Sequence, residues 1–361
     1  MISFVKRAYD NFFGAGDAAV TVPPMDGALM PNDALDRADS VADITAPDNL
    51  VFHDGAFLFS SGAVLYRLAA EGGSEPVETF GGEILALASD GAGTLAVAVS
   101  GEGIALRGGA LDGRTVGGDI DGLTAVTALC FDGASTLYVA VGSTIDTADN
   151  WVRNLMSLRA DGAVWCIEAG AAARKIAGNL AWPAGLAMLD DGRLAVSEAW
   201  RHRIDALTPD GKKQTIVSGL PAYPGRLTHV GGKIWLCLFA PRRQLVEFVL
   251  REKEFRTTMM REIPQDLWMA PALRSGESFR EPLQGGAVKQ LGVLKAWAPT
   301  RSYGLLVRFA ENFTPEASYH SRADGRRHGI TSVIADADRV FVTSKGGDAV
   351  LALSTDTKAG R

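Results

Sequence analysis

Short strand-like units separated by glycine-containing turns recur along almost the whole chain, and this repetition restricts the possible folds more than any other feature. Six stretches carry the pattern: NLVFHDGAFLFSSGAVLYRL, ILALASDGAGTLAVAVSGEGIAL, VTALCFDGASTLYVAV, GLAMLDDGRLAVSEAWRHRIDAL, RLTHVGGKIWLCLF and SVIADADRVFVTSKGGDAVLAL. Each is typical of a strand, a tight turn and a second strand, which together form a hairpin. Units of roughly 40 residues with up to four strands are typical of propeller blades, which close radially and leave few exposed edges. We therefore predict an all-β fold, a six-bladed β-propeller.

The repeats also indicate how the chain is divided. Residues 41–361 are predicted to form one propeller domain, and residues 1–40 an N-terminal extension with a short helix in FVKRAYDNFF. The segment before residue 46 is expected to supply a strand that closes the ring. Two units are interrupted by insertions, at about 143–163 and 242–302. Because long insertions on a rigid scaffold usually lie over its surface, we expect these helices and loops to cover one face.

Composition and charge exclude several classes of partner. Hydrophobic residues make up 47% of the chain and charged residues 22%, as in globular proteins with a large core. The formal net charge is −6 and no Lys/Arg run is long enough to follow a phosphate backbone, so we expect no nucleic-acid partner. Three widely spaced cysteines, Cys130, Cys166 and Cys237, favour buried free thiols over disulfides or zinc.

No apolar segment is long enough for a signal peptide or a membrane span, so we expect a cytoplasmic location. The amphipathic pattern of FVKRAYDNFF leaves open a contact of the N-terminal helix with a membrane surface. We favour the alternative, in which this helix docks on its own domain.

Three of the units begin with the same frame: PDNLVFHDG from Pro47, PAGLAMLDDG from Pro183 and PGRLTHVGG from Pro224. Proline at the first position of a strand removes no hydrogen bond from the sheet, so the frame marks strand starts. In a propeller the first strand of each blade lines the central channel, and the strand starts meet at one mouth. The residues after each proline should therefore converge: Asp48 and Asn49, Ala184 and Gly185, and Gly225 and Arg226.

These frames, together with DNWVRNLMSLRADGAVWCI, AVSEAWRHRI, AYPGRL and HGITSVIADADRVFVTS, resemble the strictosidine synthase-like branch of six-bladed propellers. That branch is related to the gluconolactonase, regucalcin and paraoxonase group. The resemblance covers about residues 40–354 and is greatest to bacterial members. It implies a small organic ligand in the central channel, and for the calcium-dependent relatives it implies acidic and Asn ligands at the frame positions.

The sequence departs from the family at the positions that matter for chemistry. Ala184 stands where the calcium-dependent relatives carry Asn, and Gly225 and Arg226 stand where they carry Asp-Asn. A guanidinium repels a nearby divalent ion in a partly desolvated channel, so we expect no metal and no other cofactor. Strictosidine synthases use a glutamate near the start of the last blade, where this chain has Thr331. Thr is no general base near neutral pH without a partner, so strictosidine-forming activity is not expected.

Further candidates are aromatic and imidazole side chains near the predicted mouth. Trp182 and Tyr223 flank the frames and Trp151 begins the first insertion. These aromatic residues either line an apolar pocket or wedge between blades. His328 precedes the last inner strand and could be a general base, an anion ligand or a packed residue; His229 more simply packs in a blade.

Two functions remain open. The first is a metal-independent ester or lactone hydrolase, by analogy with the wider family, with Asp48 and His328 as acid/base groups and Arg226 as carboxylate or oxyanion binder. Asn49, Thr331 and the three aromatic residues named above would complete the substrate site. The second is a non-catalytic propeller that binds a small anionic ligand through Arg226. Since an unpaired cation in a partly buried channel is unfavourable, we predict that Arg226 contacts Asp48; the alternative is a solvated strand edge.

Overall fold

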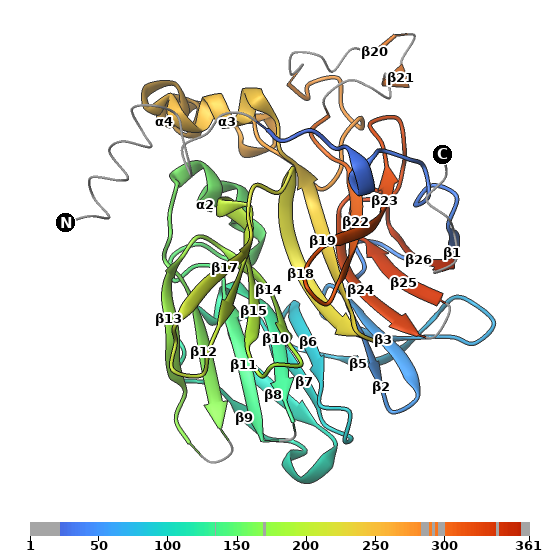
Figure 1. The fold of residues 1–361 in the computed structure, drawn as a ribbon, viewed down its shortest axis with the longest axis vertical. Coiled ribbons are helices and arrows are strands. Elements are labelled where there is room, and N and C mark those ends of the chain that lie inside the picture. Colours follow the sequence, from blue (N-terminus) through green and yellow to red (C-terminus); the bar gives the residue numbers. More distant parts are fainter. Residues whose placement is uncertain are drawn as a thin grey trace.

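The structure of the chain is a computed structural model. It describes residues 22–133, 135–168, 171–282, 289–290, 293–294, 300–336 and 339–354, and the helix expected in FVKRAYDNFF lies outside these residues. The described residues form six four-stranded antiparallel sheets, as predicted for a six-bladed propeller (Figure 1). The inner strands of neighbouring blades contact one another all the way around, so the ring is closed.

In each of the first five blades the strands follow one another in chain order from the inner strand to the outer strand. The two insertions interrupt the third and the fifth blades. Blades one to three are β2 (Asp48–His53), β3 (Ala56–Ser61), β4 (Val64–Leu68), β5 (Ser74–Thr79); β6 (Ile84–Ser89), β7 (Leu95–Val99), β8 (Gly103–Arg107), β9 (Thr115–Val116); and β10 (Val126–Asp132), β11 (Thr136–Val141), β12 (Gly162–Glu168), β13 (Arg174–Leu180). Blades four to six are β14 (Pro183–Met188), β15 (Leu194–Glu198), β16 (Arg203–Leu207), β17 (Lys213–Val217); β18 (Ala222–Val230), β19 (Lys233–Pro241), β22 (Gly304–Ala310), β23 (Pro315–Ser321); and β24 (Ile330–Asp336), β25 (Arg339–Ser344), β26 (Ala349–Ser354), β1 (Asp39–Asp43).

The sixth blade is assembled from both ends of the described chain. Strand β1 pairs antiparallel with β26, and Asp43 lies opposite Ala349. This is the closing strand expected before residue 46. It starts at Asp39, slightly before the residue 41 at which the propeller domain was predicted to begin. Closure by a distant strand removes one exposed sheet edge and joins the first blade to the last.

The core lies between neighbouring blades. All five residues of β7, Leu95–Val99, are buried, because a middle strand is covered on both faces by adjacent blades. Side chains of the second and third blades, such as Ala86 and Val139, belong to one apolar cluster. Ile204 and Leu236 likewise join blades four and five. The blades therefore stabilise one another through shared apolar surface.

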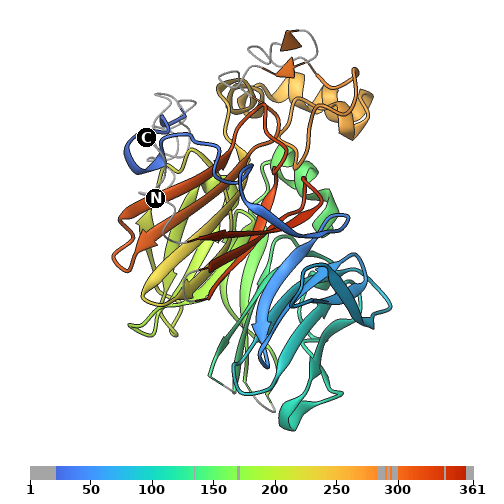
Figure 2. The ribbon, with the colours of Figure 1, turned by 90° about the vertical axis from the view of Figure 1, so that its right-hand side faces the viewer.

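The two insertions lie at one end of the propeller, as predicted (Figures 1 and 2). The first contains α2 (Trp151–Ser157), and the second contains α3 (Gln244–Arg251), α4 (Lys253–Glu262) and the short hairpin β20 (Lys289–Gln290) with β21 (Val293–Leu294). Helices α2 and α4 contact each other, so the insertions meet above the channel. Within the described residues, no helix is both long and apolar enough to cross a membrane.

Candidate functional site

Each inner strand begins with a break in register against its neighbour in the blade. The breaks fall between Asp48 and Val51, Ile84 and Ala86, Val126 and Ala128, Pro183 and Gly185, Pro224 and Leu227, and Ile330 and Ser332. A bulge of this kind re-aims a side chain at the end of a strand. Residues at the six breaks line one pocket at the end of the channel beneath the insertions: Asp48, Leu85, Thr127, Ala184, Arg226 and Thr331.

The proline frame therefore marks only three of the six inner strands, whereas all six have a register break near their start. Pro183 begins β14 as expected, and Pro47 immediately precedes β2. Pro224 is instead the third residue of β18, so the prediction that it starts the strand was wrong. A register break on each side of Pro224 explains how the strand tolerates a residue without a backbone N–H.

Glycines in the frame bring two inner strands close together. A Cβ on Gly185 would lie 2.4 Å from the Gly225 carbonyl oxygen and 2.7 Å from the Arg226 Cα, so no larger residue fits without a backbone shift. The Gly225 carbonyl also accepts a hydrogen bond of 2.6 Å from Ser197 Oγ. This close approach of β14 and β18 fixes the position of the Arg226 backbone at the end of the channel.

The pocket has a volume of about 360 Å³ and a lining of two chemical kinds. Apolar and aromatic residues of the lining include Trp151, Trp182, Phe239 and Leu273. Trp151 and Leu273 come from the two insertions, so the insertions contribute walls of the pocket. Charged residues of the lining are Asp48, Glu83, Asp149, Arg226 and Lys345. A pocket with this lining suits a small organic molecule that has an apolar body and a polar group.

Arg226 contacts Asp48 directly, as predicted. Its Nη1 lies 2.5 Å from Asp48 Oδ1 and donates a second hydrogen bond of 3.2 Å to the Thr331 carbonyl. Its Nη2 donates to the Leu85 carbonyl at 2.9 Å. The side chain is 20% exposed, so the alternative of a solvated strand edge is wrong. The guanidinium thus joins blades one, two, five and six across the channel.

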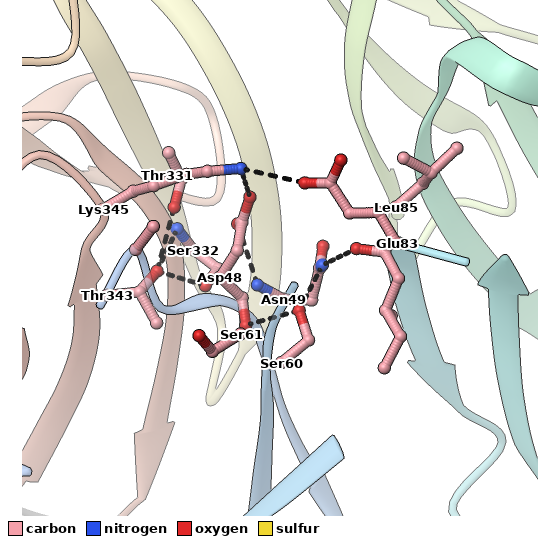
Figure 3. Close-up of polar contacts among 12 residues, drawn as sticks. Asp48, Asn49, Ser60, Ser61, Glu83, Leu85, Thr331, Ser332, Thr343 and Lys345 are labelled. Atoms are coloured by element: carbon pink, nitrogen blue, oxygen red, sulfur yellow. Dashed lines mark hydrogen bonds and ion pairs between the residues drawn. The ribbon is translucent and has the colours of Figure 1, made fainter. Parts of the chain in front are cut away.

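Lys345 is a second cation at the same carboxylate, and the sequence analysis did not identify it. Its Nζ lies 3.0 Å from Asp48 Oδ2 and 3.9 Å from Glu83 Oε1, and Figure 3 shows it between the two carboxylates. Burial alone would raise the pKa of Asp48, but Arg226 and Lys345 outweigh it and hold that pKa well below its usual range. Asp48 therefore stays ionised with both oxygens occupied. Its geometry and charge state do not support the proton-transferring role that we expected for it.

Of the two polar residues expected to complete the substrate site, Thr331 lines the pocket and Asn49 lies outside its lining. Asn49 has a left-handed backbone with φ of 58°, which Asn tolerates better than most residues. Its Nδ2 donates to Ser60 Oγ at 2.8 Å and to the Ile84 carbonyl at 3.0 Å (Figure 3), so it connects blades one and two behind the pocket wall. Thr331 does line the pocket, and its Oγ1 lies 3.0 Å from Thr343 Oγ1.

His328 is buried outside the pocket lining. Its Nδ1 lies 2.7 Å from Ser302 Oγ, and its Nε2 donates a hydrogen bond of 2.7 Å to the Arg322 carbonyl. Burial lowers the pKa of His328, which favours the neutral ring. With both ring nitrogens engaged inside the fold, His328 has a structural environment, and the geometry does not support the acid/base role expected for it.

The three aromatic candidates divide between the two expected environments. Trp151 and Trp182 line the pocket, and each stacks on Trp200, with ring centroids 6.1 and 5.6 Å apart. Tyr223 is fully buried against Trp200 and Phe239 and is not part of the lining. It wedges into the protein interior, so the expectation that it lines the pocket was wrong.

The charged residues present do not fit a divalent cation. Both oxygens of Asp48 are taken by cationic side chains, and Arg226 and Lys345 would lie beside any ion bound there. Elsewhere in the described part of the chain, Asp190, His229 and Glu311 place potential ligand atoms within 4.8 Å of one another. His229 lines the opposite end of the channel, so this group is separate from the pocket.

Glu83 and Lys345 are the main polar residues that sequence reasoning missed. Glu83 immediately precedes β6 and thus holds the position of a strand start, like Asp48, but in a unit without the proline frame. Extending the frame to units without proline would have found it. Lys345 follows β25, a second strand, and nothing in its local sequence distinguishes it from a lysine in any hairpin turn.

No protein-family model matches the chain, and no curated protein matches it either. Solved structures do match: the calcium-binding protein regucalcin from Agrobacterium tumefaciens is 12% identical with a TM-score of 0.55, and the match covers 88% of this chain and 93% of that one. A gluconolactonase from Xanthomonas campestris is 12% identical (TM-score 0.54; 87% and 88% covered), and a luciferin-regenerating enzyme is 11% identical (TM-score 0.53; 89% and 94% covered). At such identities the similarity establishes fold alone. The chain is therefore similar in fold to gluconolactonase- and regucalcin-like six-bladed propellers, while its resemblance to the strictosidine synthase-like branch stays a prediction.

Proposed function

We propose that the protein is a metal-independent hydrolase of small esters or lactones and that the reaction takes place in the pocket beneath the insertions. The observation that carries the proposal is the pair formed by Lys345 and Glu83 at the edge of an apolar pocket. The Glu83 side chain is 47% exposed, and its carboxylate lies 3.9 Å from the Lys345 ammonium. Glu83 is thus held near the pocket while water can still reach it.

In this proposal Glu83 acts as the general base. It removes a proton from a water molecule, and the water oxygen forms a bond to the carbonyl carbon of the substrate. The negative charge that develops on the carbonyl oxygen is stabilised by the Lys345 ammonium, which Asp48 holds in position. The C–O bond to the leaving alcohol then breaks, and the alcohol oxygen receives the proton from Glu83. A lactone would give one hydroxy acid, and an ester would give an acid and an alcohol.

A second candidate is a non-catalytic propeller that binds a small organic anion. One specific observation favours it: the described residues that line the pocket include no serine, cysteine or histidine. The pocket therefore lacks the usual nucleophile and imidazole base of metal-independent esterases. Lys345 and Arg226 would bind the carboxylate of the ligand in this case, and Trp151 and Trp182 would contact its apolar part.

Hydrolysis of a panel of aryl esters and five- and six-membered lactones tests the first candidate, measured by pH-stat with and without EDTA. We expect turnover that EDTA does not change. Glu83→Gln should lower kcat/KM by about 10²- to 10⁴-fold, the usual contribution of a general base. Lys345→Met should also lower it, because the oxyanion loses a donor. The matched controls are Glu71→Gln and Lys212→Met, at exposed positions away from the pocket.

The outcomes separate the two candidates. Turnover that Glu83→Gln leaves unchanged would rule out the assigned base. No turnover of any substrate, combined with saturable quenching of tryptophan fluorescence by a small carboxylate, would support the binding protein. That quenching should be lost in Trp151→Phe with Trp182→Phe if the signal comes from the pocket.

A further inference from the structure

Arg243 is a buried cation that the pocket does not use. It lies between β19 and the first residue of α3 and is 5% exposed. Among the described residues, no hydrogen-bond partner is found for its Nε, Nη1 or Nη2. A guanidinium carries five N–H donors, and buried donors without partners are rare in folded proteins.

The surroundings of Arg243 add positive charge. Burial lowers the pKa of Arg243 to about 10, and the nearby guanidinium of Arg301 contributes to that decrease. At this pKa Arg243 is still protonated at neutral pH. The carboxylate of Glu247, in α3, is already paired with the adjacent Arg242, whose Nε lies 3.0 Å from Glu247 Oε1.

The acidic residues of the same insertion act on Arg301 and not on Arg243: Glu281 and Asp266 raise the pKa of Arg301, whereas no carboxylate contributes to the pKa of Arg243. From Leu283 to Pro299 the chain contains neither Asp nor Glu. Burial likewise lowers the pKa values of Arg256 and Arg301 in this insertion. An uncompensated buried charge is strongly destabilising, so a negative group from outside the described residues is the simplest partner.

We propose that Arg243, with Arg301 nearby, binds a small inorganic oxyanion of the phosphate type at the N-terminal end of α3. Guanidinium groups bind oxyanions through paired N–H donors, which makes an oxyanion a better partner than a halide. The anion would neutralise the buried charge and connect the second insertion to the top of β19. Arg243 does not line the pocket, so this site is independent of the proposed hydrolase activity.

Thermal unfolding of the full chain in inorganic phosphate tests the proposal. A parallel series contains chloride in place of phosphate, at the same ionic strength and in the same zwitterionic buffer. At a concentration 100-fold above Kd, a single-site ligand should raise the midpoint of a chain of 361 residues by about 3–4 °C. Arg243→Met keeps much of the side-chain volume and removes the charge, so this variant should show no such rise. In anion-free buffer it should be at least as stable as the parent.

Two controls locate the effect. Arg251→Met removes an exposed charge at the other end of α3 and should respond to phosphate as the parent does. Lys345→Met removes a cation of the pocket and should also keep the phosphate response, since the proposed anion is not in the pocket.

A parent midpoint that does not depend on phosphate would overturn the proposal and would mean that water solvates Arg243. The same conclusion would follow if Arg243→Met retained the full response. If Arg243→Met fails to fold, crystals of the parent grown with phosphate, or with arsenate as an anomalous scatterer, decide the question. A tetrahedral anion within hydrogen-bond distance of Arg243 supports the site, and ordered water alone in that position overturns it.

Discussion

Asp48→Asn is the substitution that most directly tests how the candidate pocket is held together. Asp48 contacts both Arg226 and Lys345, at 2.5 and 3.0 Å. Asparagine keeps the size and shape of the side chain but removes its charge. The two cations, which come from blades five and six, would then face each other around a neutral amide.

The expected loss is large because the ion pairs are shielded from water. The Asp48 side chain is 12% exposed, and those of Arg226 and Lys345 are 20% and 26% exposed. Removing one partner of such a buried pair destabilises a protein by about 3–5 kcal/mol. With an unfolding entropy of roughly 2.1 cal/mol/K per residue, 361 residues give about 0.76 kcal/mol/K, so the midpoint should fall by about 4–7 °C.

The same substitution should change the acid side of the stability profile. The folded-state pKa of Asp48 is depressed, so its contribution is complete above the unfolded value of about 3.9. The contribution is lost as the pH falls from that value towards the folded-state pKa. Between about pH 4 and pH 2 the parent should therefore lose stability more steeply than Asp48→Asn. Calorimetry or denaturant unfolding at each pH measures both effects.

Two comparisons make the reasoning refutable. Arg226→Met added to Asp48→Asn should restore part of the lost stability, because one of the unpaired cations is gone. Asp210→Asn removes an exposed carboxylate that pairs with Lys212 and should leave the midpoint unchanged. If Asp48→Asn unfolds within 1 °C of the parent and keeps its acid profile, Asp48 does not anchor the two cations.

Three further predictions concern metal binding, the buried carboxylate of Glu198 and the reactivity of cysteine. Purified protein dialysed against calcium should retain far less than one equivalent by elemental analysis, because Arg226 and Lys345 surround the carboxylate that an ion would need; one tightly held equivalent would contradict this. Glu198→Gln should lower the unfolding midpoint by several degrees, since its fully buried carboxylate pairs with two arginines and a lysine; a midpoint equal to that of the parent would show that the network is neutral to stability. Burial raises the pKa of Cys237 well above its usual range, so a thiol reagent should react with this fully buried cysteine only as fast as the protein unfolds; rapid modification of Cys237 in the native protein would disprove it.

Much of the channel could be predicted because its signals are local. Proline and glycine at the strand starts indicated where Asp48, Ala184 and Arg226 would converge, and the structure places all three in one pocket. The prediction was weaker for aromatic and imidazole side chains. Trp182 faces the pocket, while Tyr223, which immediately precedes the frame proline Pro224, is buried away from it. A shift of one residue at a bulge reverses which side chain faces the channel, and the proline frame alone does not reveal that shift.

The sequence by itself determined the number of blades, the position of the closing strand and the insertions, because alternating apolar residues and glycine turns act over a few residues. Only the tertiary structure decided the electrostatics of the pocket. Lys345 lies 297 positions from Asp48 in the chain and meets it only because the sixth blade closes beside the first. Closure of the ring also determines that Asp48 is paired with two cations. The charge state of Asp48 therefore depends on partners that are distant in the chain and that no local sequence pattern indicates.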